Sequence, residues 1–296
     1  MKSFAEILAA ARARGPKRVA VAAAADHAVL EAIALADREG LCQAVLFGDS
    51  EEIRRLAPAV GLDLSRHEVV HVTDKAEAAA QAVARVRAGG AEVLMKGMLD
   101  TATLLRAVLN RETGLRTGRR LTHTFVLEVP ALGRLLLISD AAFNVAPDLA
   151  GKAAILSNAV SLAHALGIEE PKVAVLAAVE VVNPDMPATT DAAALKEMGA
   201  RGEFGRCLVD GPLAMDLAVS PEAAKHKGVG GPVAGHADIL IVPDIEAGNI
   251  LYKGLVYLAG AKVGGVVLGA AAPVVLVSRA DSPESKLNAI ALSLLV

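Results

Sequence analysis

The amino-acid sequence predicts an α/β fold built on mainly parallel sheets. Short, uniformly apolar runs alternate with longer segments in which apolar residues recur at helical spacing. Strands that are apolar along their whole length are typical of parallel sheets covered by helices, because neither face of such a sheet meets water. Polar residues follow several of these runs directly, as connections between strands and helices require.

The first third of the chain shows this alternation most plainly. We expect its strands at residues 18–24, 43–48, 68–72 and 92–97. Helices are expected between them at residues 26–40, 50–61, 74–88 and 100–109. Gly40 closes the first of these helices and Ser50 begins the second, because glycine ends helices and serine caps their amino ends.

The alternation breaks near residues 114–121, where we place a domain boundary. Two strands joined by a tight turn through Pro130 and Gly133 come next, which predicts an antiparallel insertion. The strand–helix alternation then resumes. We expect further helices at residues 149–166, 191–201, 214–226, after 248 and from 282, and strands at 172–178, 206–211, 237–244, 264–269 and 273–278.

The composition limits the class of function. The chain has 296 residues, of which 54% are hydrophobic, so it is long enough for two domains with substantial cores. Aromatic residues make up 2% and Trp is absent, which argues against stacking of single-stranded nucleic acid. The formal net charge is -3 and basic residues are spread along the chain, so neither a duplex-DNA footprint nor a basic membrane patch is expected.

A soluble, cytoplasmic protein is expected. Residues 263–277 form the longest apolar stretch, but its Gly and Pro residues indicate two buried strands and no membrane span. The first residues lack the apolar core of a secretion signal. The two cysteines, Cys42 and Cys207, lie in separate apolar runs, so we expect free, buried thiols.

Several common catalytic motifs are missing from the sequence. It contains no G-x-G-x-x-G loop, Walker A loop, G-x-S-x-G elbow or H-E-x-x-H helix. The seven histidines show no metal-ligand spacing, so no metal site is expected. We interpret His71, inside an apolar strand, as a core or strand-edge residue.

Five polar clusters stand directly after apolar strands. Because ligands bind at the carboxyl ends of parallel strands, these clusters are candidates for one shared site. Any single cluster fits caps and turns equally well, but five together, some with Arg or Lys, favour a shared polar site. The clusters are KGMLDTATLLR (96–106), SDAAFNVAPD (139–148), VEVVNPDMPATTDA (179–192), PDIEAGNILYK (243–253) and SRADSPE (278–284).

Longer motifs carry a family resemblance. DGPLAMDLA, AAKHKG, PVAGHADILIVPDIEAGNILYK and LVSRADS, in this order, closely resemble the phosphate acetyl/butyryltransferase family, as do KGMLDTATLLRAVLN and ISDAAFNVAPD upstream. The resemblance covers essentially the whole chain. It implies two three-layer α/β domains with mainly parallel sheets and an active-site cleft between them. The first domain is expected from residues 1–118 plus 269–296, and the second from residues 119–268.

The resemblance implies the reaction acyl-CoA plus phosphate to acyl phosphate plus CoA, run reversibly. Coenzyme A is then a substrate, no cofactor is bound covalently, and the chain is expected to form a homo-oligomer. The butyryl branch of the family implies butyryl-CoA or a similar short acyl-CoA, with acetyl transfer as the alternative. A non-catalytic domain that senses CoA or acyl phosphate is the alternative of another class. A metal- and nicotinamide-dependent decarboxylating dehydrogenase would need clustered acidic ligands, and we find no convincing set.

The resemblance also assigns catalytic residues. Arg279 matches the family arginine that binds phosphate, for which the planar guanidinium suits bidentate pairing, although it also fits a charge at a strand end. Arg106 matches a second family arginine, although it also fits a solvated helix face. Ser278 matches the family serine near the reacting carbonyl, where its hydroxyl could stabilise the oxyanion. Further substrate-binding candidates, each of which also fits a capping or turn role, are Asn249, Lys253, Glu246, Asn144, Asp140, Lys96 and Asn183.

One departure from the family concerns the CoA thiol. Acetyltransferases carry an aspartate seven residues after the family serine, and this chain has Ser285 there, next to Glu284. Arg279 and backbone amides could stabilise the thiolate instead. We also expect the Gly248–Asn249 pair to begin a helix whose free N–H groups form an anion seat.

Overall fold

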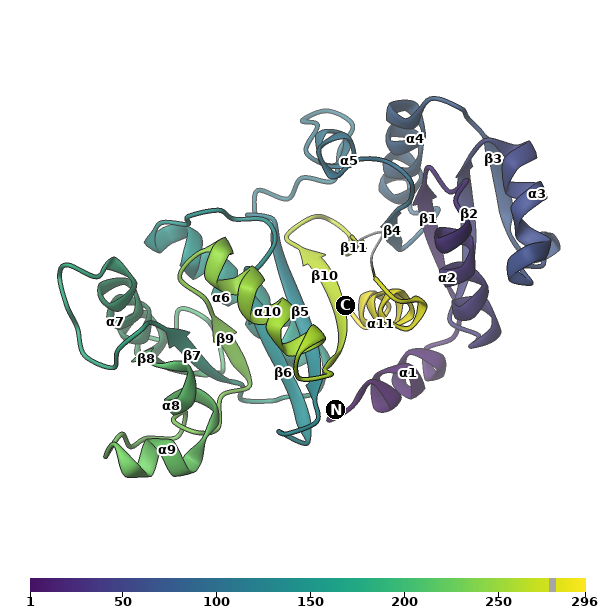
Figure 1. Cartoon of the computed structure of the whole chain (residues 1–296). Coiled ribbons are helices and arrows are strands. Elements are labelled where there is room, and N and C mark those ends of the chain that lie inside the picture. The colour runs from purple at the N-terminus through teal and green to yellow at the C-terminus, as the bar shows by residue number, and fades with distance from the viewer. Residues whose placement is uncertain (277–280) are drawn as a thin grey trace. The chain divides into compact units, whose positions relative to one another are not determined.

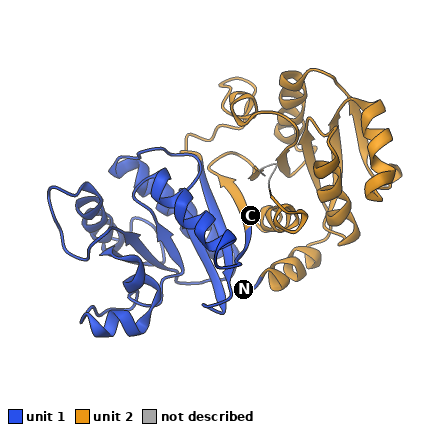
Figure 2. Cartoon of the chain, in the orientation of Figure 1, with its two compact units in different colours: residues 1–3, 122–263 blue, residues 4–121, 264–296 orange. Residues whose placement is uncertain are grey.

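The computed structural model describes residues 1–276 and 281–296, and these residues form two compact units. Unit 1 comprises residues 1–3 and 122–263, and unit 2 comprises residues 4–121 and 264–296 (Figure 2). Each unit consists of a sheet with helices packed against it (Figure 1).

Unit 2 is a mainly parallel sheet in the strand order β3-β2-β1-β4-β11-β10. Neighbouring strands from β3 to β11 are parallel, and β10 is antiparallel to β11. Its strands are β1 (Lys17–Ala22), β2 (Cys42–Gly48), β3 (Glu68–His71), β4 (Val93–Lys96), β10 (Lys262–Leu268) and β11 (Val274–Val275). Its helices are α1 (Phe4–Ala13), α2 (His27–Arg38), α3 (Ser50–Val60), the 3-10 helix η1 (Leu64–Arg66), α4 (Lys75–Arg87), α5 (Thr101–Val108) and α11 (Pro283–Ser293).

Aspartates cap four α-helices of unit 2. Asp26, Asp49, Asp74 and Asp100 each cap a helix by accepting a backbone N–H of its first turn. Helix α2 packs against α11 and α3, while α4 packs against α5. The connection from β3 to β4 runs back along the sheet, and a right-handed crossover therefore places α4 on the face opposite α2 and α3.

Unit 1 has the strand order β5-β6-β9-β7-β8, in which β5 and β6 form the antiparallel pair and the other pairs are parallel. This pair is the antiparallel insertion predicted from the turn through Pro130 and Gly133. The strands are β5 (Thr122–Val129), β6 (Arg134–Ser139), β7 (Lys172–Leu176), β8 (Leu208–Leu213) and β9 (Ile239–Ile241). The helices are α6 (Leu149–Ala165), α7 (Pro187–Ala200), α8 (Met215–Val219), α9 (Pro221–His226) and α10 (Ile245–Tyr257).

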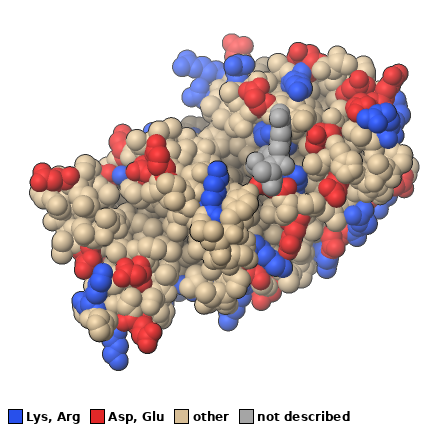
Figure 3. Space-filling view, viewed as in Figure 1, with Lys and Arg blue, Asp and Glu red and all other residues tan. Residues whose placement is uncertain are grey.

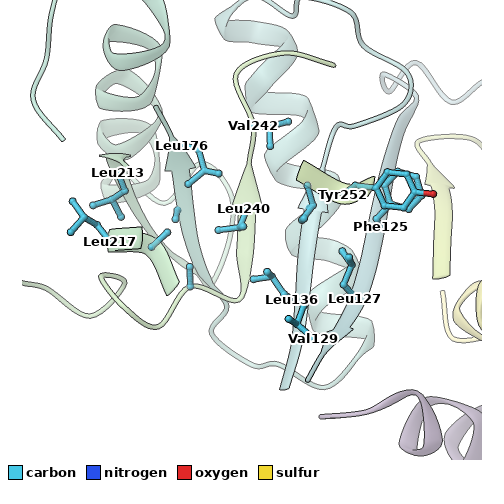
Figure 4. Packing of buried hydrophobic residues seen from close by; sticks show 14 of the residues in the cluster. Phe125, Leu127, Val129, Leu136, Leu176, Leu213, Leu217, Leu240, Val242 and Tyr252 are labelled. Atoms are coloured by element: carbon cyan, nitrogen blue, oxygen red, sulfur yellow. The ribbon is translucent and has the colours of Figure 1, made fainter. Parts of the chain in front are cut away.

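A buried apolar cluster fills unit 1 between its sheet and the helices α8, α9 and α10 (Figure 4). The rings of Phe125 on β5 and Tyr252 on α10 are stacked in it, with centroids 3.9 Å apart and planes 6° apart. Leu127, Leu136 and Leu240 extend the cluster along the strands. This stacking attaches α10 to the sheet, since buried aromatic rings bring the largest apolar surfaces.

Some predicted elements differ from the observed ones. The expected helix 214–226 is two helices, because Pro221 cannot donate a backbone hydrogen bond and Ser220 caps α9 by accepting from Ala223 N. Helix α7 starts at Pro187, earlier than the expected residue 191. No helix in the described ranges has the length and apolarity to cross a membrane. On the face shown in Figure 3, basic and acidic side chains are interspersed.

Candidate functional site

Three of the five polar clusters lie at one edge of the unit 1 sheet. Strands β6, β9 and β7 are parallel and aligned, since Ser139 and Val175 both pair with Ile241. One cluster follows the carboxyl end of each strand: residues 139–148 after β6, 243–253 after β9 and 179–192 after β7. The topology therefore brings together segments that are about 100 residues apart in sequence, at the edge where parallel sheets bind ligands.

Asp140 organises the loop after β6. It is 2% exposed, and Oδ1 accepts hydrogen bonds from the backbone N–H groups of Ala142 and Phe143 at 3.0 and 2.9 Å. Oδ2 accepts from His123 N at 3.0 Å and from Asn144 Nδ2 at 2.6 Å. Four donors thus satisfy a buried carboxylate, so Asp140 holds the loop and orients Asn144.

Helix α10 is held against the same loop. Asn249 Nδ2 donates to the carbonyl of Ala141 at 3.2 Å. A Cβ added at Gly248 would lie 3.0 Å from Ala141 Cα and 2.8 Å from Val242 Cγ2. Glycine is needed here because the helix backbone approaches the loop too closely for a side chain. The motifs ISDAAFN and PDIEAGN therefore contact each other through these residues.

The prediction that a helix begins at Gly248–Asn249 and binds an anion there is wrong. Helix α10 begins at Ile245, and Asp244 caps it by accepting from Ala247 N at 2.8 Å. The N–H of Gly248 already donates within the helix to Asp244 O at 3.2 Å. The N–H groups of Ala247 and Gly248 are therefore already hydrogen-bonded, because the helix starts after Asp244 and not at the Gly248–Asn249 pair.

The remaining unit 1 candidates occupy different settings. Glu246, in the first turn of α10, and Lys253, two turns further on, are both exposed. Asn183 lies in the loop between β7 and α7, where its Oδ1 accepts from Asp185 N at 3.0 Å. Its backbone N–H donates to Thr189 Oγ1 at 2.9 Å, so Asn183 shapes this loop.

The unit 2 sheet has a comparable edge. Ala22 pairs with Lys96, and Met95 pairs with Val275, so β1, β4 and β11 end side by side. The ammonium of Lys96 donates to the carbonyls of Gly97 and Leu99 at 3.3 and 3.1 Å. A Cβ at Gly97 would lie 2.2 Å from the carbonyl oxygen of Ala23. The chain therefore crosses the edge so closely that only glycine fits.

Arg106 lies on α5, which follows this edge, and its side chain is exposed. It makes no hydrogen bond or ion pair with the residues that the structure describes. Hydrogen bonds from Thr103 to the cap residue Asp100 lower the pKa of that carboxyl, and the nearby Arg106 contributes to the shift. The predicted catalytic residues Ser278 and Arg279 lie outside the described residues.

Ser285, which replaces the family aspartate, belongs to a helix cap. Ser282 caps α11 by accepting from Ser285 N at 3.1 Å, and the two hydroxyl oxygens are 3.0 Å apart. This hydrogen bond gives Ser285 a local structural role at the start of α11.

His123 is a buried polar residue that was not among the predicted site residues. Its imidazole is buried at the start of β5, and neither ring nitrogen has a hydrogen-bond partner among the described residues. Burial lowers its pKa to about 4 against the opposing effect of Asp140, so the ring is neutral near pH 7. The ring also lies near Phe143, with centroids 6.2 Å apart. The sequence signal that could have identified it is a histidine within the strand segment THTF, which pairs with the strand before the Asp140 loop.

Other polar residues have structural roles. His71 accepts a hydrogen bond from Ser50 N through Nδ1 at 3.2 Å, which places it at the start of α3 as a strand-edge residue. Burial raises the pKa of the Cys42 thiol to about 12, and both cysteines are free. Within residues 1–276 and 281–296, no group of three or more His, Cys, Asp or Glu side chains could hold a metal ion.

The sheets and their polar edges, together with solved structures, define the class of protein: an α/β enzyme with the phosphotransacylase fold. A branched-chain phosphotransacylase from Enterococcus faecalis superimposes with a TM-score of 0.85 and 37% identity, over 94% of this chain and 98% of that one. The chain belongs to the phosphate acetyl/butaryl transferase family, an acyltransferase family whose model matches residues 72–294.

Relatives of two named activities match over most of their length. The chain is 51% identical to a phosphate butyryltransferase of Clostridium acetobutylicum over 296 residues, which is 100% of this chain and 98% of the relative. It is 48% identical to a phosphate acetyltransferase of Thermotoga maritima over 283 residues, 96% of each protein. These similarities confirm the family resemblance of the sequence motifs.

Proposed function

We propose that the protein is a phosphate acyltransferase that converts acyl-CoA and phosphate reversibly to acyl phosphate and CoA, with butyryl-CoA or a similar short acyl-CoA preferred. The observation that carries the proposal is the identity of 51% to a phosphate butyryltransferase over the whole chain. Acetyl transfer is the second candidate, favoured by the identity of 48% to a phosphate acetyltransferase. One or two methylenes in an apolar pocket contribute only about 1–3 kcal/mol each, so we expect a graded preference.

The proposed roles follow from charge and position. Arg279 and Arg106 bind phosphate, and Ser278 donates a hydrogen bond to the oxyanion that forms at the acyl carbonyl. In support, Arg106 brings a guanidinium without an internal partner among the described residues, and Ser278 follows β11 by three residues in the sequence. Lys96 adds positive charge at the end of β4, although it also donates to two carbonyls.

The unit 1 candidates divide into two proposed roles. Asp140 and Asn249 position the loop after β6, as their hydrogen bonds within unit 1 indicate. Asn144, Asn183, Glu246 and Lys253 are the proposed substrate contacts. Because the Ser285 hydroxyl belongs to the cap of α11, we propose that Arg279 and backbone amides stabilise the CoA thiolate without a general base at position 285.

A thiol-release assay tests the reaction. Purified protein is incubated with acetyl-, propionyl-, butyryl- and hexanoyl-CoA, with and without phosphate, and free thiol is followed. We expect release that depends on phosphate and is fastest with butyryl-CoA. A strict preference for acetyl-CoA would select the acetyltransferase. Absence of phosphate-dependent release with every donor, while CoA still binds by calorimetry, would indicate the CoA-sensing domain.

We also propose a cytoplasmic homo-oligomer, at least a dimer, and domain bounds of 1–118 plus 269–296 and 119–268. In support of association, Ile250, Tyr257 and Leu258 on and after α10 expose large apolar side chains, of which Leu258 is 89% exposed. Light scattering of the purified protein at micromolar concentration should give at least twice the chain mass. A monomer would contradict the proposal.

A further inference from the structure

A second candidate binding site lies in unit 2, away from the carboxyl edge of its sheet. A cavity of about 620 Å³ opens at the amino ends of the strands, beside Lys17, the first residue of β1, and Glu92, which precedes β4. The end of α4, the loop after α5, the turn before β11 and the end of α11 complete its wall. Lys96 marks the opposite end of β4, so the length of the strand separates the cavity from the candidate catalytic edge.

The cavity wall is positively charged. Its lining includes four cationic side chains, Lys17, Arg87, Arg111 and Arg116, and one acidic side chain, Glu92. Lys17 donates to the carbonyl of Leu294 at 2.8 Å, and Arg87 donates to that of Glu112. Carbonyl acceptors satisfy hydrogen bonds but cancel no charge, so these two residues keep their positive charge.

Arg111 and Arg116 differ from most arginines around them. Neither side chain forms a hydrogen bond or an ion pair with residues in the described ranges. Elsewhere in unit 2, Arg55, Arg66 and Arg85 each pair with a carboxylate. Two guanidinium groups without partners at one cavity provide forked donors that match the geometry of phosphate and carboxylate groups.

The rest of the wall restricts the ligand further. It is aliphatic, with residues such as Val86, Leu115 and Pro273, and no aromatic residue lines the cavity as described. It therefore offers no ring for a nucleobase to stack on. The volume lies within the range of small-molecule sites and exceeds what a single phosphate ion needs.

We propose that this cavity binds a small polyanionic metabolite, with at least two phosphate or carboxylate groups and no aromatic base, at a site separate from acyl transfer. Arg111 and Arg116 pair with the anionic groups, while Lys17 and Arg87 contribute further positive charge to the lining. Glu92 is already engaged by the backbone N–H of Arg18 at 2.7 Å.

Calorimetric titration with inorganic tripolyphosphate and, separately, citrate tests the proposal and distinguishes phosphate from carboxylate chemistry. We expect the double variant Arg111→Gln/Arg116→Gln to weaken binding of the preferred probe at least tenfold. The control Arg54→Gln/Arg55→Gln removes equal charge from exposed positions of α3 and should change binding less than twofold. The arginines of both double variants are exposed, so we expect the variants to fold, and thermal melts serve as the check.

Equal affinity in the wild type and the Arg111/Arg116 variant would overturn the site, as would absence of binding of both probes to the wild type. An equal loss in both double variants would also overturn it, because the effect would then be one of net charge. The titration does not require acyl transfer, so its outcome is independent of the proposed function. Where the acyl-transfer assay shows activity, the basal rate of the Arg111/Arg116 variant should equal that of the wild type.

Discussion

The imidazole of His123 lies edge-on against the ring of Phe125, with centroids 4.3 Å apart and planes at 75°. Phe125 is itself stacked on Tyr252 of α10, so the three rings form one row that joins β5 to α10. The backbone N–H of His123 donates to Asp140, which anchors the loop after β6. A neutral histidine thus lies between the aromatic core of unit 1 and the candidate site.

The first prediction concerns the pH dependence of stability. Burial lowers the pKa of His123 from 6.5 to about 4. Between these values the unfolded chain binds a proton that the folded chain does not, so the stability from this residue is present above pH 6.5 and lost as the pH falls toward 4. In urea unfolding at a series of pH values, His123→Leu should lose less stability over this window than the wild type.

The exposed His226 is the control, and His226→Gln should follow the wild-type curve. Carboxylates that protonate in the same window but do not interact with His123 affect all three proteins alike, so the difference between the curves reports His123 together with its neighbour Asp140. Parallel curves for His123→Leu and the wild type would show that the imidazole is not held neutral by burial.

The second prediction uses two glycines of α10. At Gly248 a Cβ would lie 2.8 Å from Val242 Cγ2 and 3.0 Å from Ala141, whereas at Gly254 it would meet nothing within 4 Å. Overpacking costs about 1–3 kcal/mol, so Gly248→Ala should lower the free energy of unfolding by that amount. Gly254→Ala should raise it by about 0.5–1 kcal/mol, because alanine favours the helix.

Denaturant unfolding measures both variants of α10. Gly248→Ala should also slow acyl transfer, because the clash displaces Ala141 and the loop that carries Asn144. If the two alanine variants are equally stable, α10 does not approach the loop as closely as the structure shows.

The third prediction concerns the phosphate-binding arginines. Arg279→Lys keeps the charge but loses the planar fork, and a charge-assisted hydrogen bond contributes about 1.5–3 kcal/mol. We expect a drop of about ten- to hundredfold in rate or phosphate affinity, and a larger one for Arg279→Ala. Arg106→Lys should weaken phosphate binding in the same direction. Steady-state kinetics at varied phosphate measure these effects.

Arg54→Lys, on an exposed face of α3, is the control for the arginine series and should behave as the wild type. Circular dichroism should show intact folds throughout. If both Arg279 variants show wild-type kinetics, Arg279 does not bind phosphate, and the prediction is wrong.

Local patterns determined much of the fold. The strands and helices were readable because unbroken apolar runs and a helical spacing of 3.6 residues are both patterns of neighbouring residues. The antiparallel β5–β6 pair was readable for the same reason, since Pro130 and Gly133 mark its turn. The break between α8 and α9 was missed because helical periodicity continues across Ser220 and Pro221.

The sequence by itself determined the family and the identity of the polar clusters, because long motifs need no coordinates to be recognised. Only the tertiary structure decided which clusters meet and which groups are already engaged. Asp140 looked like a substrate ligand, yet four donors occupy its carboxylate. Arg111 and Arg116 belong to no motif of the sequence, and only the fold places both of them on one cavity. Both facts depend on contacts between residues far apart along the chain, and local sequence does not encode them.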